Sequence, residues 1–189
     1  MKHLRLFENF KSEIDVMSDL ISRINRKELQ LYMDDNNWES DDEESAIEYL
    51  LSDEYSLRVD DSGLIEFEYL DKSIIRLIGD NYVKLYHFAP EKYRDNINKD
   101  GLISGVVKTN SYQNSYSGIY LTTQTTGPVV NGYKTKIRDT HNCEPIMVVV
   151  KAKLQDISPD PDDSGISSGR YQFIISKVLP GDIVSIESV

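Results

Sequence analysis

Apolar side chains in the first part of the chain recur at helical spacing. Between residues 4 and 33 they return every three or four positions, which predicts one or two amphipathic helices. An acidic block follows at residues 34–54 and encloses a short helical pattern at residues 46–51; a charge run of this kind is usually a solvated face. Two alternating segments within residues 56–69 flank the turn-forming residues 60–63, and together they predict a hairpin.

The pattern changes at residues 79–81, where Gly, Asp and Asn form a turn signal. We place a domain boundary here, between a mainly helical and acidic N-terminal region at residues 1–80 and a second domain at residues 81–189. The second domain is rich in segments of strand type, at residues 84–88, 118–122, 145–154, 170–176 and 183–187. Because few helices separate these strands, we expect an α+β fold of short mixed sheets rather than a doubly wound parallel sheet.

One strand and one helix carry the strongest patterns in the second domain. Residues 145–154 are apolar on both faces in their middle, which is typical of a central strand. Residues 90–102 have the spacing of an amphipathic helix, with Ile97 facing inward and Gly101 marking its end. On the strand at residues 118–122, alternation places the side chains of odd-numbered and even-numbered residues on opposite faces.

Turn-forming residues gather in the connections of the second domain. Residues 103–117 are rich in Gly, Ser, Asn and Tyr and predict a loop. Residues 124–143 predict either a loop with a short helix or a flexible flap. Residues 158–169, rich in Pro and Asp, predict a polar connection between two strands.

Charge and cysteine content narrow the classes of function. The chain has 32 acidic and 21 basic side chains and a formal net charge of −11, which disfavours non-specific attraction to nucleic-acid phosphates and leaves room for a local basic groove. The single cysteine, Cys143, excludes an internal disulfide and a thiolate-rich zinc site, so no metal centre is expected. No apolar run reaches membrane-spanning length, and the first residues lack the apolar core of a secretory signal. We therefore expect a cytoplasmic protein.

His87 is the first candidate for chemistry. It lies in the short apolar strand at residues 84–88, next to a loop, where an imidazole can meet a ligand. A histidine that is simply packed in the core is the commoner explanation for such a position, so this stretch alone does not decide the function.

Three short motifs follow one another in the second domain: Leu85-Tyr86-His87 with residues 97–102, then Gly118-Ile119-Tyr120-Leu121-Thr122, then residues 171–175 running into Leu179-Pro180-Gly181-Asp182-Ile183. In order and approximate spacing, they resemble the His-Tyr-Glu branch of the ADP-ribosyltransferase superfamily, which includes poly- and mono-ADP-ribosyl polymerases and diphtheria-like toxins. The resemblance covers roughly residues 82–187. It implies two short sheets around an NAD cleft, with the first eighty residues left as an extension.

The resemblance implies that NAD is the substrate, and it assigns roles within the cleft. His87 takes the position of the histidine that hydrogen-bonds the adenine-side ribose. Tyr120 takes the position of the tyrosine that stacks on the nicotinamide ring, where an aromatic face is needed, and Tyr133 is the candidate that completes the sandwich. Tyr86 and Gly118 belong to the same NAD-binding set.

Gln172 stands where the family has a glutamate. In the family, that glutamate hydrogen-bonds the nicotinamide ribose and steadies the positive charge that develops as the glycosidic bond breaks. An amide can bond a ribose hydroxyl but cannot offset that charge as a carboxylate does. The change disfavours polymer synthesis and leaves full inactivity open. Another carboxylate could approach instead, from Glu187 or from one of Asp160, Asp162 and Asp163.

The leading expectation is a mono-ADP-ribosyltransferase that moves ADP-ribose from NAD to a macromolecular acceptor. The acidic surface favours a protein acceptor with a basic patch over nucleic acid. Residues 1–80 would then recognise the target or act as a brake. The alternative from another class is a catalytically silent protein with the same fold that binds a partner or serves a phage as an accessory.

Two weaker hypotheses remain. An NAD-dependent RNA 2′-phosphotransferase shares the fold, but that family relies on several Arg and His residues around the cleft, and this chain has only three histidines, at His3, His87 and His141. The opening decapeptide resembles short leaders of some tailed-phage proteins, and Leu6-Phe7-Glu8 fits a Leu-x-Glu cleavage pattern. An ordinary helix start explains those residues equally well, so a phage or toxin-type effector is one setting among others.

Overall fold

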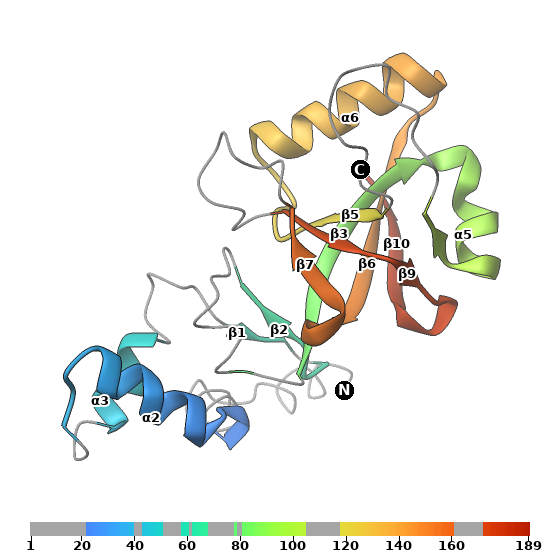
Figure 1. Cartoon of the computed structure of the whole chain (residues 1–189). Coiled ribbons are helices and arrows are strands. Elements are labelled where there is room, and N and C mark those ends of the chain that lie inside the picture. The colour runs from blue at the N-terminus through green and yellow to red at the C-terminus, as the bar shows by residue number, and fades with distance from the viewer. Residues whose placement is uncertain are drawn as a thin grey trace, which may run out of the picture. The chain divides into compact units, whose positions relative to one another are not determined.

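The computed structural model of the chain has an α+β fold, with a main antiparallel sheet and few helices (Figure 1). The structure describes residues 22–39, 43–50, 58–60, 62–67, 78, 81–104, 118–160 and 172–189. The chain divides into two compact units, Met1–Asn81 and Tyr82–Val189. The helical pattern before residue 22, the cleavage pattern at Leu6-Phe7-Glu8, most of the loop at residues 103–117, and Asp162 and Asp163 lie outside the described residues.

Helices in the first unit follow the predicted apolar spacing. Helix α2 (Arg26–Asp35) begins after Asn25, whose side chain accepts hydrogen bonds from the backbone N–H groups of its first turn. Leu29 and Met33, four residues apart, are almost fully buried. Helix α3 (Glu43–Leu50) lies within the acidic block, as expected.

A short hairpin completes the described part of the first unit. Strands β1 (Arg58–Val59) and β2 (Ile65–Glu66) pair antiparallel. In the connecting turn, the Asp60 carboxylate accepts hydrogen bonds from the backbone N–H groups of Ser62 and Leu64, at 2.9 and 3.0 Å. The predicted hairpin is confirmed.

The second unit is built around one antiparallel sheet. Its strands follow one another in the order β7 (Ile157–Pro159), β8 (Gln172–Ile175), β5 (Ile119–Thr122), β3 (Tyr82–Pro90), β6 (Pro145–Lys153) and β10 (Ile183–Ser188). A separate pair is formed by β4 (Leu102–Ile103) and β9 (Lys177–Val178). The expectation of mixed sheets is wrong for the pairs within the described residues, all of which are antiparallel. The helices of this unit do not link parallel neighbours, as a βαβ unit would.

Strand β6 is an internal strand of this sheet, with a neighbour on each side, as its sequence predicted. It pairs with all nine residues of β3 on one side and with β10 on the other. Ile146, Val148 and Val150 are completely buried. A strand with apolar residues on both faces needs cover on both faces, and on one of them Met147 and Val149 of β6 pack against Val130 and Ile137 of helix α6.

Helix α5 and its final glycine agree with the sequence pattern. A short 3-10 turn, η2 (Glu91–Tyr93), leads into α5 (Arg94–Asp100), and Ile97 is buried. Gly101 has a φ of +79°, and a Cβ at this position would lie 2.1 Å from the carbonyl oxygen of Val178. Both the left-handed backbone and the close approach require glycine here.

Helix α6 (Pro128–His141) decides between the two alternatives for residues 124–143. The segment is a regular helix of 14 residues rather than a flap. It begins with Pro128 in its first turn and ends at Asn142 in the left-handed conformation, which are favourable start and stop residues. Its buried residues Val130 and Ile137 join a core cluster with β3 and β6.

Strand β7 falls where the sequence predicted a polar connection, and that prediction is wrong for residues 158 and 159. Ser158 and Pro159 pair with Ile174 and Phe173 on β8. Both residues are exposed, because β7 is the edge strand of the sheet. Edge strands tolerate Pro, since no neighbour needs its missing N–H on the outer side, so Pro and Ser concealed the strand from the apolar pattern.

Candidate active site

A row of side chains crosses the sheet at the predicted site. Tyr86 on β3 lies opposite Val149 on β6 and Thr122 on β5, and Thr122 lies opposite Gln172 on β8. Side chains directly opposite each other in antiparallel strands project from the same face. Tyr86 and Val149 belong to the cluster packed under α6, so Thr122 and Gln172 share the α6 face of the sheet.

Tyr120 projects from this same face. It stands two residues before Thr122 and pairs with Ile174 of β8. Ile119 and Leu121 are buried on the opposite face, as the alternation predicted, whereas Tyr120 is half-buried. The ring is therefore near the sheet surface and keeps part of its area accessible.

Tyr133 connects helix α6 to the third motif. Its hydroxyl donates a hydrogen bond to the side-chain oxygen of Gln172, 39 positions further along the chain. Its ring stacks on Phe88 of β3, with centroids 6.2 Å apart and an interplanar angle of 17°. The predicted sandwich tyrosine and the predicted third-motif residue are thus in direct contact.

His87 stands where strands β3 and β5 part. The β3–β5 ladder in the described residues contains the pair Tyr86 with Thr122, and the next two pairs in this register, His87 with Leu121 and Phe88 with Tyr120, are not formed. Instead, Nδ1 of the His87 ring lies 2.9 Å from the carbonyl oxygen of Tyr120. The imidazole therefore hydrogen-bonds the backbone of the strand that carries the second motif. His87 lies opposite Val148 on β6, whereas its neighbour Tyr86 lies opposite Val149, so the His87 side chain starts from the sheet face opposite the one that carries Tyr120 and Gln172.

This contact determines the tautomer of His87. A carbonyl oxygen only accepts hydrogen bonds, so Nδ1 must carry the proton. Burial lowers the pKa of His87 below its ordinary value of 6.5, and the bond to Tyr120 opposes this effect more weakly. The ring is consequently neutral at neutral pH, and its Nε2 is a hydrogen-bond acceptor.

Gly118 has a structural reason that does not involve a ligand. A Cβ on this residue would lie 2.1 Å from Cγ2 of Ile174, which packs against the start of β5. Glycine lets β5 and β8 approach closely at this point. Its predicted membership of the NAD-binding set stays a prediction.

The two described alternative carboxylates, Glu187 and Asp160, lie at very different distances from Gln172 along the sheet. Glu187 is exposed on β10, opposite Met147, and accepts a hydrogen bond of 2.7 Å from Ser185. Strands β6, β3 and β5 stand between β10 and β8, so Glu187 is remote from Gln172 along the sheet. Asp160, by contrast, is 8% exposed and donates a backbone hydrogen bond of 3.0 Å to the carbonyl oxygen of Gln172.

Two side chains near this face, Phe88 and Thr122, were not assigned roles from the sequence, and a third, Asp160, was one of several alternatives. Phe88 forms the platform for Tyr133, and Thr122 is buried between Tyr86 and Gln172. The alternation of side chains within each strand could have placed Phe88 and Thr122 on this face. Asp160 was one of several open alternatives, and its signal was the short alternating segment that begins at Ile157.

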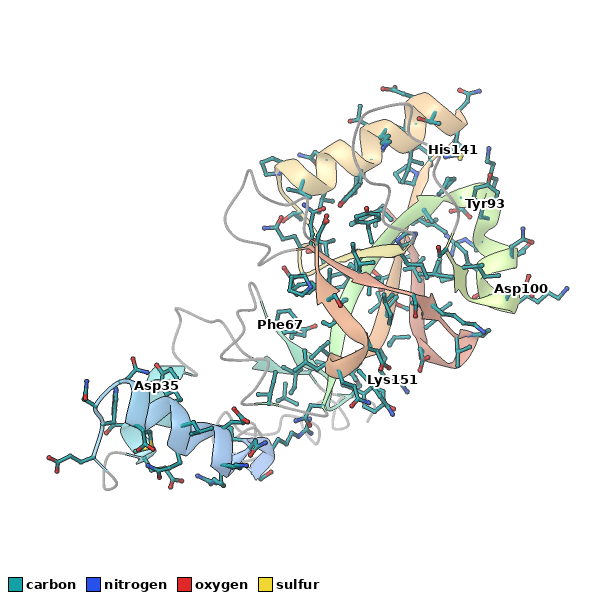
Figure 2. All side chains as sticks on the ribbon, viewed as in Figure 1. Asp35, Phe67, Tyr93, Asp100, His141 and Lys151 are labelled. Atoms are coloured by element: carbon teal, nitrogen blue, oxygen red, sulfur yellow. The ribbon has the colours of Figure 1, made fainter. Side chains whose placement is uncertain are left out.

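A cavity of about 290 Å³ lies elsewhere in the second unit. Three lysines, Lys151, Lys153 and Lys177, line it together with Asp156 and Asp182. The ammonium groups of Lys151 and Lys153 approach the Tyr82 ring to 5.2 and 5.7 Å; Lys151 is labelled in Figure 2. None of the predicted site residues lines this cavity.

Other classes of site are not found in the described part of the chain. No group of three His, Cys, Asp or Glu side chains there is arranged to hold a metal ion. The helices of these residues include none with the length and apolar character to cross a membrane.

Neither a scan against protein-family models nor a search of curated proteins finds a match to this chain. The function is therefore proposed from the residues and geometry of the chain itself.

Proposed function

We propose that the second unit is an ADP-ribosyltransferase domain of the His-Tyr-Glu type, and that it transfers single ADP-ribose units from NAD to a macromolecular acceptor. The observation that carries this proposal is the contact of His87 with the backbone of Tyr120. It links the first two motifs, and the bond of Tyr133 to Gln172 links the third motif to helix α6. Tyr133 and Gln172 meet through their side chains, whereas His87 reaches the second motif through the backbone of Tyr120.

The chemistry of these side chains suits recognition of the separate parts of a dinucleotide. Nε2 of His87 is an acceptor on a neutral ring and suits a ribose hydroxyl, which is a donor. Tyr120 presents a half-buried ring for stacking on nicotinamide. Tyr133, held by Phe88 and Gln172, supplies a second aromatic ring at the same face. Recognition of this kind fixes both halves of NAD before any bond breaks.

The proposed reaction balances without a further cofactor. The bond between the nicotinamide nitrogen and C1′ of its ribose breaks, and its electron pair returns to the ring, so that neutral nicotinamide leaves. Positive charge then develops on C1′ and the ring oxygen of the ribose. A lone pair of the acceptor forms the new bond to C1′, and the acceptor's proton passes to solvent. The domain's task is positioning the reactants and stabilising the developing charge.

A protein with a basic surface patch fits the whole chain as acceptor better than nucleic acid does, and the residues that favour it lie in the first unit, since residues 82–189 hold 12 basic and 11 acidic side chains. The chain's net charge of −11 repels phosphates and attracts lysine- and arginine-rich surfaces. The amide of Gln172 in place of a carboxylate agrees with transfer of one unit rather than polymer synthesis.

Gln172 also favours a second candidate, an NAD-binding protein without turnover. Its side-chain oxygen is already held by Tyr133, and an amide does not stabilise a positive charge as a carboxylate does. This candidate predicts saturable NAD binding that depends on Tyr120, with no release of nicotinamide.

The deciding experiment uses the full chain and NAD labelled on the adenosine side. We expect nicotinamide release and transfer of label to the protein itself or to an added protein acceptor. H87A and Y120A should abolish both signals. Y93A is the matched control, since Tyr93 is 41% exposed on η2 and its ring contacts His141, outside the motifs (Figure 2). Label transfer that survives H87A and Y120A would overturn the site assignment.

A further inference from the structure

We infer that Asp160 supplies the carboxylate that Gln172 lacks, so that two residues on neighbouring strands share the role of one glutamate. This inference rests on the proposed ADP-ribosyltransferase function. In this division, Gln172 bonds the nicotinamide ribose, and Asp160 stabilises the positive charge on C1′.

Register places Asp160 beside Gln172. On β7 and β8, Ser158 lies opposite Ile174 and Pro159 lies opposite Phe173, so the next residue, Asp160, comes opposite Gln172. The backbone N–H of Asp160 donates to the carbonyl oxygen of Gln172 at 3.0 Å, which continues the ladder by one residue. Residues bonded in this way have Cα atoms about 5.5 Å apart and side chains on one face.

Asp160 therefore extends the row that already contains Tyr86, Thr122 and Gln172. Among the described residues of that row, it is the one with a charged side chain. The other members are neutral, so the negative charge lies at the β7 end of the face that carries Tyr120. Glu187, the other described alternative, lies at the opposite edge strand of the sheet.

The burial of Asp160 is unusual for its position. The two residues before it, Ser158 and Pro159, are exposed, whereas Asp160 is 8% exposed. Aspartate is seldom buried without a specific reason, because the charged form loses its hydration. Asp160 is shielded from solvent at the end of an exposed edge strand and is bonded through its backbone N–H to the third-motif residue, which is the placement that the chemistry requires.

The chemical step assigns one task to each side chain. As the bond from C1′ to nicotinamide breaks, its electron pair leaves with nicotinamide and positive charge builds on the ribose. The negative charge of the Asp160 carboxylate stabilises the positive charge on the ribose. This electrostatic attraction is strongest where little water lies between the two groups. The Gln172 amide hydrogen-bonds a ribose hydroxyl and holds the sugar against the carboxylate. No proton transfer to Asp160 is needed, since the acceptor's proton passes to solvent.

The first test is D160N, which removes the charge and keeps the shape. We expect nicotinamide release to fall by about 10²- to 10³-fold, the usual loss on removing one stabilising group, while the Kd for NAD changes less than about 10-fold. D156N is the matched control, because Asp156 is exposed on the turn before β7 and its substitution changes net charge equally. Wild-type turnover by folded D160N would overturn the inference and leave the proposed function standing.

The second test is the substitution Q172E, measured with Asp160 present and again in the D160N background. If Asp160 already provides the charge, Q172E should change turnover by less than about 10-fold in the wild-type background. In the D160N background, the same substitution should restore activity. A rise of about 100-fold for Q172E with Asp160 present would contradict the inference, even if D160N fails to fold. If wild type and Q172E are folded but release no nicotinamide, the proposed function fails, and the inference fails with it.

Discussion

Nδ1 of His87 lies 2.9 Å from the carbonyl oxygen of Tyr120, a residue 33 positions further along the chain. The contact joins two strands at the point where their ladder ends, and it leaves Nε2 as the acceptor of a neutral ring. The structural and the proposed catalytic roles of this histidine therefore reside on different ring nitrogens. That separation makes the two roles distinguishable by mutation.

H87N should separate the two roles. An asparagine amide can donate to the Tyr120 carbonyl from nearly the position of Nδ1, but it provides nothing at the position of Nε2. We expect H87N to keep most of the stability and to lose NAD cleavage. H87A should lose both, with a fall in the free energy of unfolding of about 1–3 kcal/mol from the unsatisfied carbonyl. Urea unfolding and nicotinamide release measure the two properties; active H87N would contradict the role of Nε2.

The lowered pKa of His87 predicts how stability depends on pH. Burial disfavours the charged ring in the folded protein, while the unfolded ring titrates near its ordinary value of 6.5. Below pH 6.5 the unfolded state therefore binds more protons than the folded state, and stability falls as the pH drops further towards the lowered pKa. Above pH 6.5 this contribution is fully present and constant.

Urea unfolding of wild type and H87N between pH 8 and pH 5 tests this linkage. The stability difference between wild type and H87N should be constant above pH 6.5 and should shift against wild type below it. A difference that does not change over the whole range would show that His87 titrates as an exposed imidazole.

The bond from Tyr133 to Gln172 should be measurable by itself. Y133F removes the hydroxyl and keeps the ring that stacks on Phe88, so we expect a loss of about 1 kcal/mol in the free energy of unfolding. Y133A also removes the ring and should cost more. In a double-mutant cycle with Q172A, the hydroxyl's contribution should disappear when Gln172 is absent. Additive effects would argue against the bond.

Two glycines provide a matched test of the fold. G101A should destabilise the second unit by about 1–3 kcal/mol, because Gly101 has a φ of +79° and its added Cβ would meet the carbonyl oxygen of Val178. G132A on α6 should instead stabilise by about 0.5–1 kcal/mol, since nothing lies within 4 Å of the added Cβ. Thermal unfolding of the two variants should therefore shift in opposite directions. Equal shifts would contradict the account of helix α5 and its end.

The periodic parts of the fold could be predicted from the sequence because packing there obeys local rules. The apolar run of β6, the inward position of Ile97 and the stop at Gly101 each follow from spacing or from one residue's conformational preference. Strand direction could not be derived in this way, since it depends on which distant segments become neighbours. Strand β7 was not predicted, because an edge strand with exposed Ser158 and Pro159 has no apolar alternation.

In the candidate site, too, local features could be predicted from the sequence and tertiary contacts could not. His87, Tyr120 and Gln172 could be named from motifs, because each motif is local. The bond from His87 to Tyr120 and the position of Asp160 beside Gln172 depend on where β3 leaves β5 and on the register of β7 with β8. Register is a tertiary property that short alternating segments leave undetermined.

A crystal structure of the protein with a non-hydrolysable NAD analogue tests the central claim most directly. We predict that the nicotinamide ring lies against Tyr120, that a hydroxyl of the adenine-side ribose donates to Nε2 of His87, and that Gln172 contacts the nicotinamide ribose. An analogue bound elsewhere, for example in the lysine-lined cavity beside Tyr82, or no binding at all, would contradict the account.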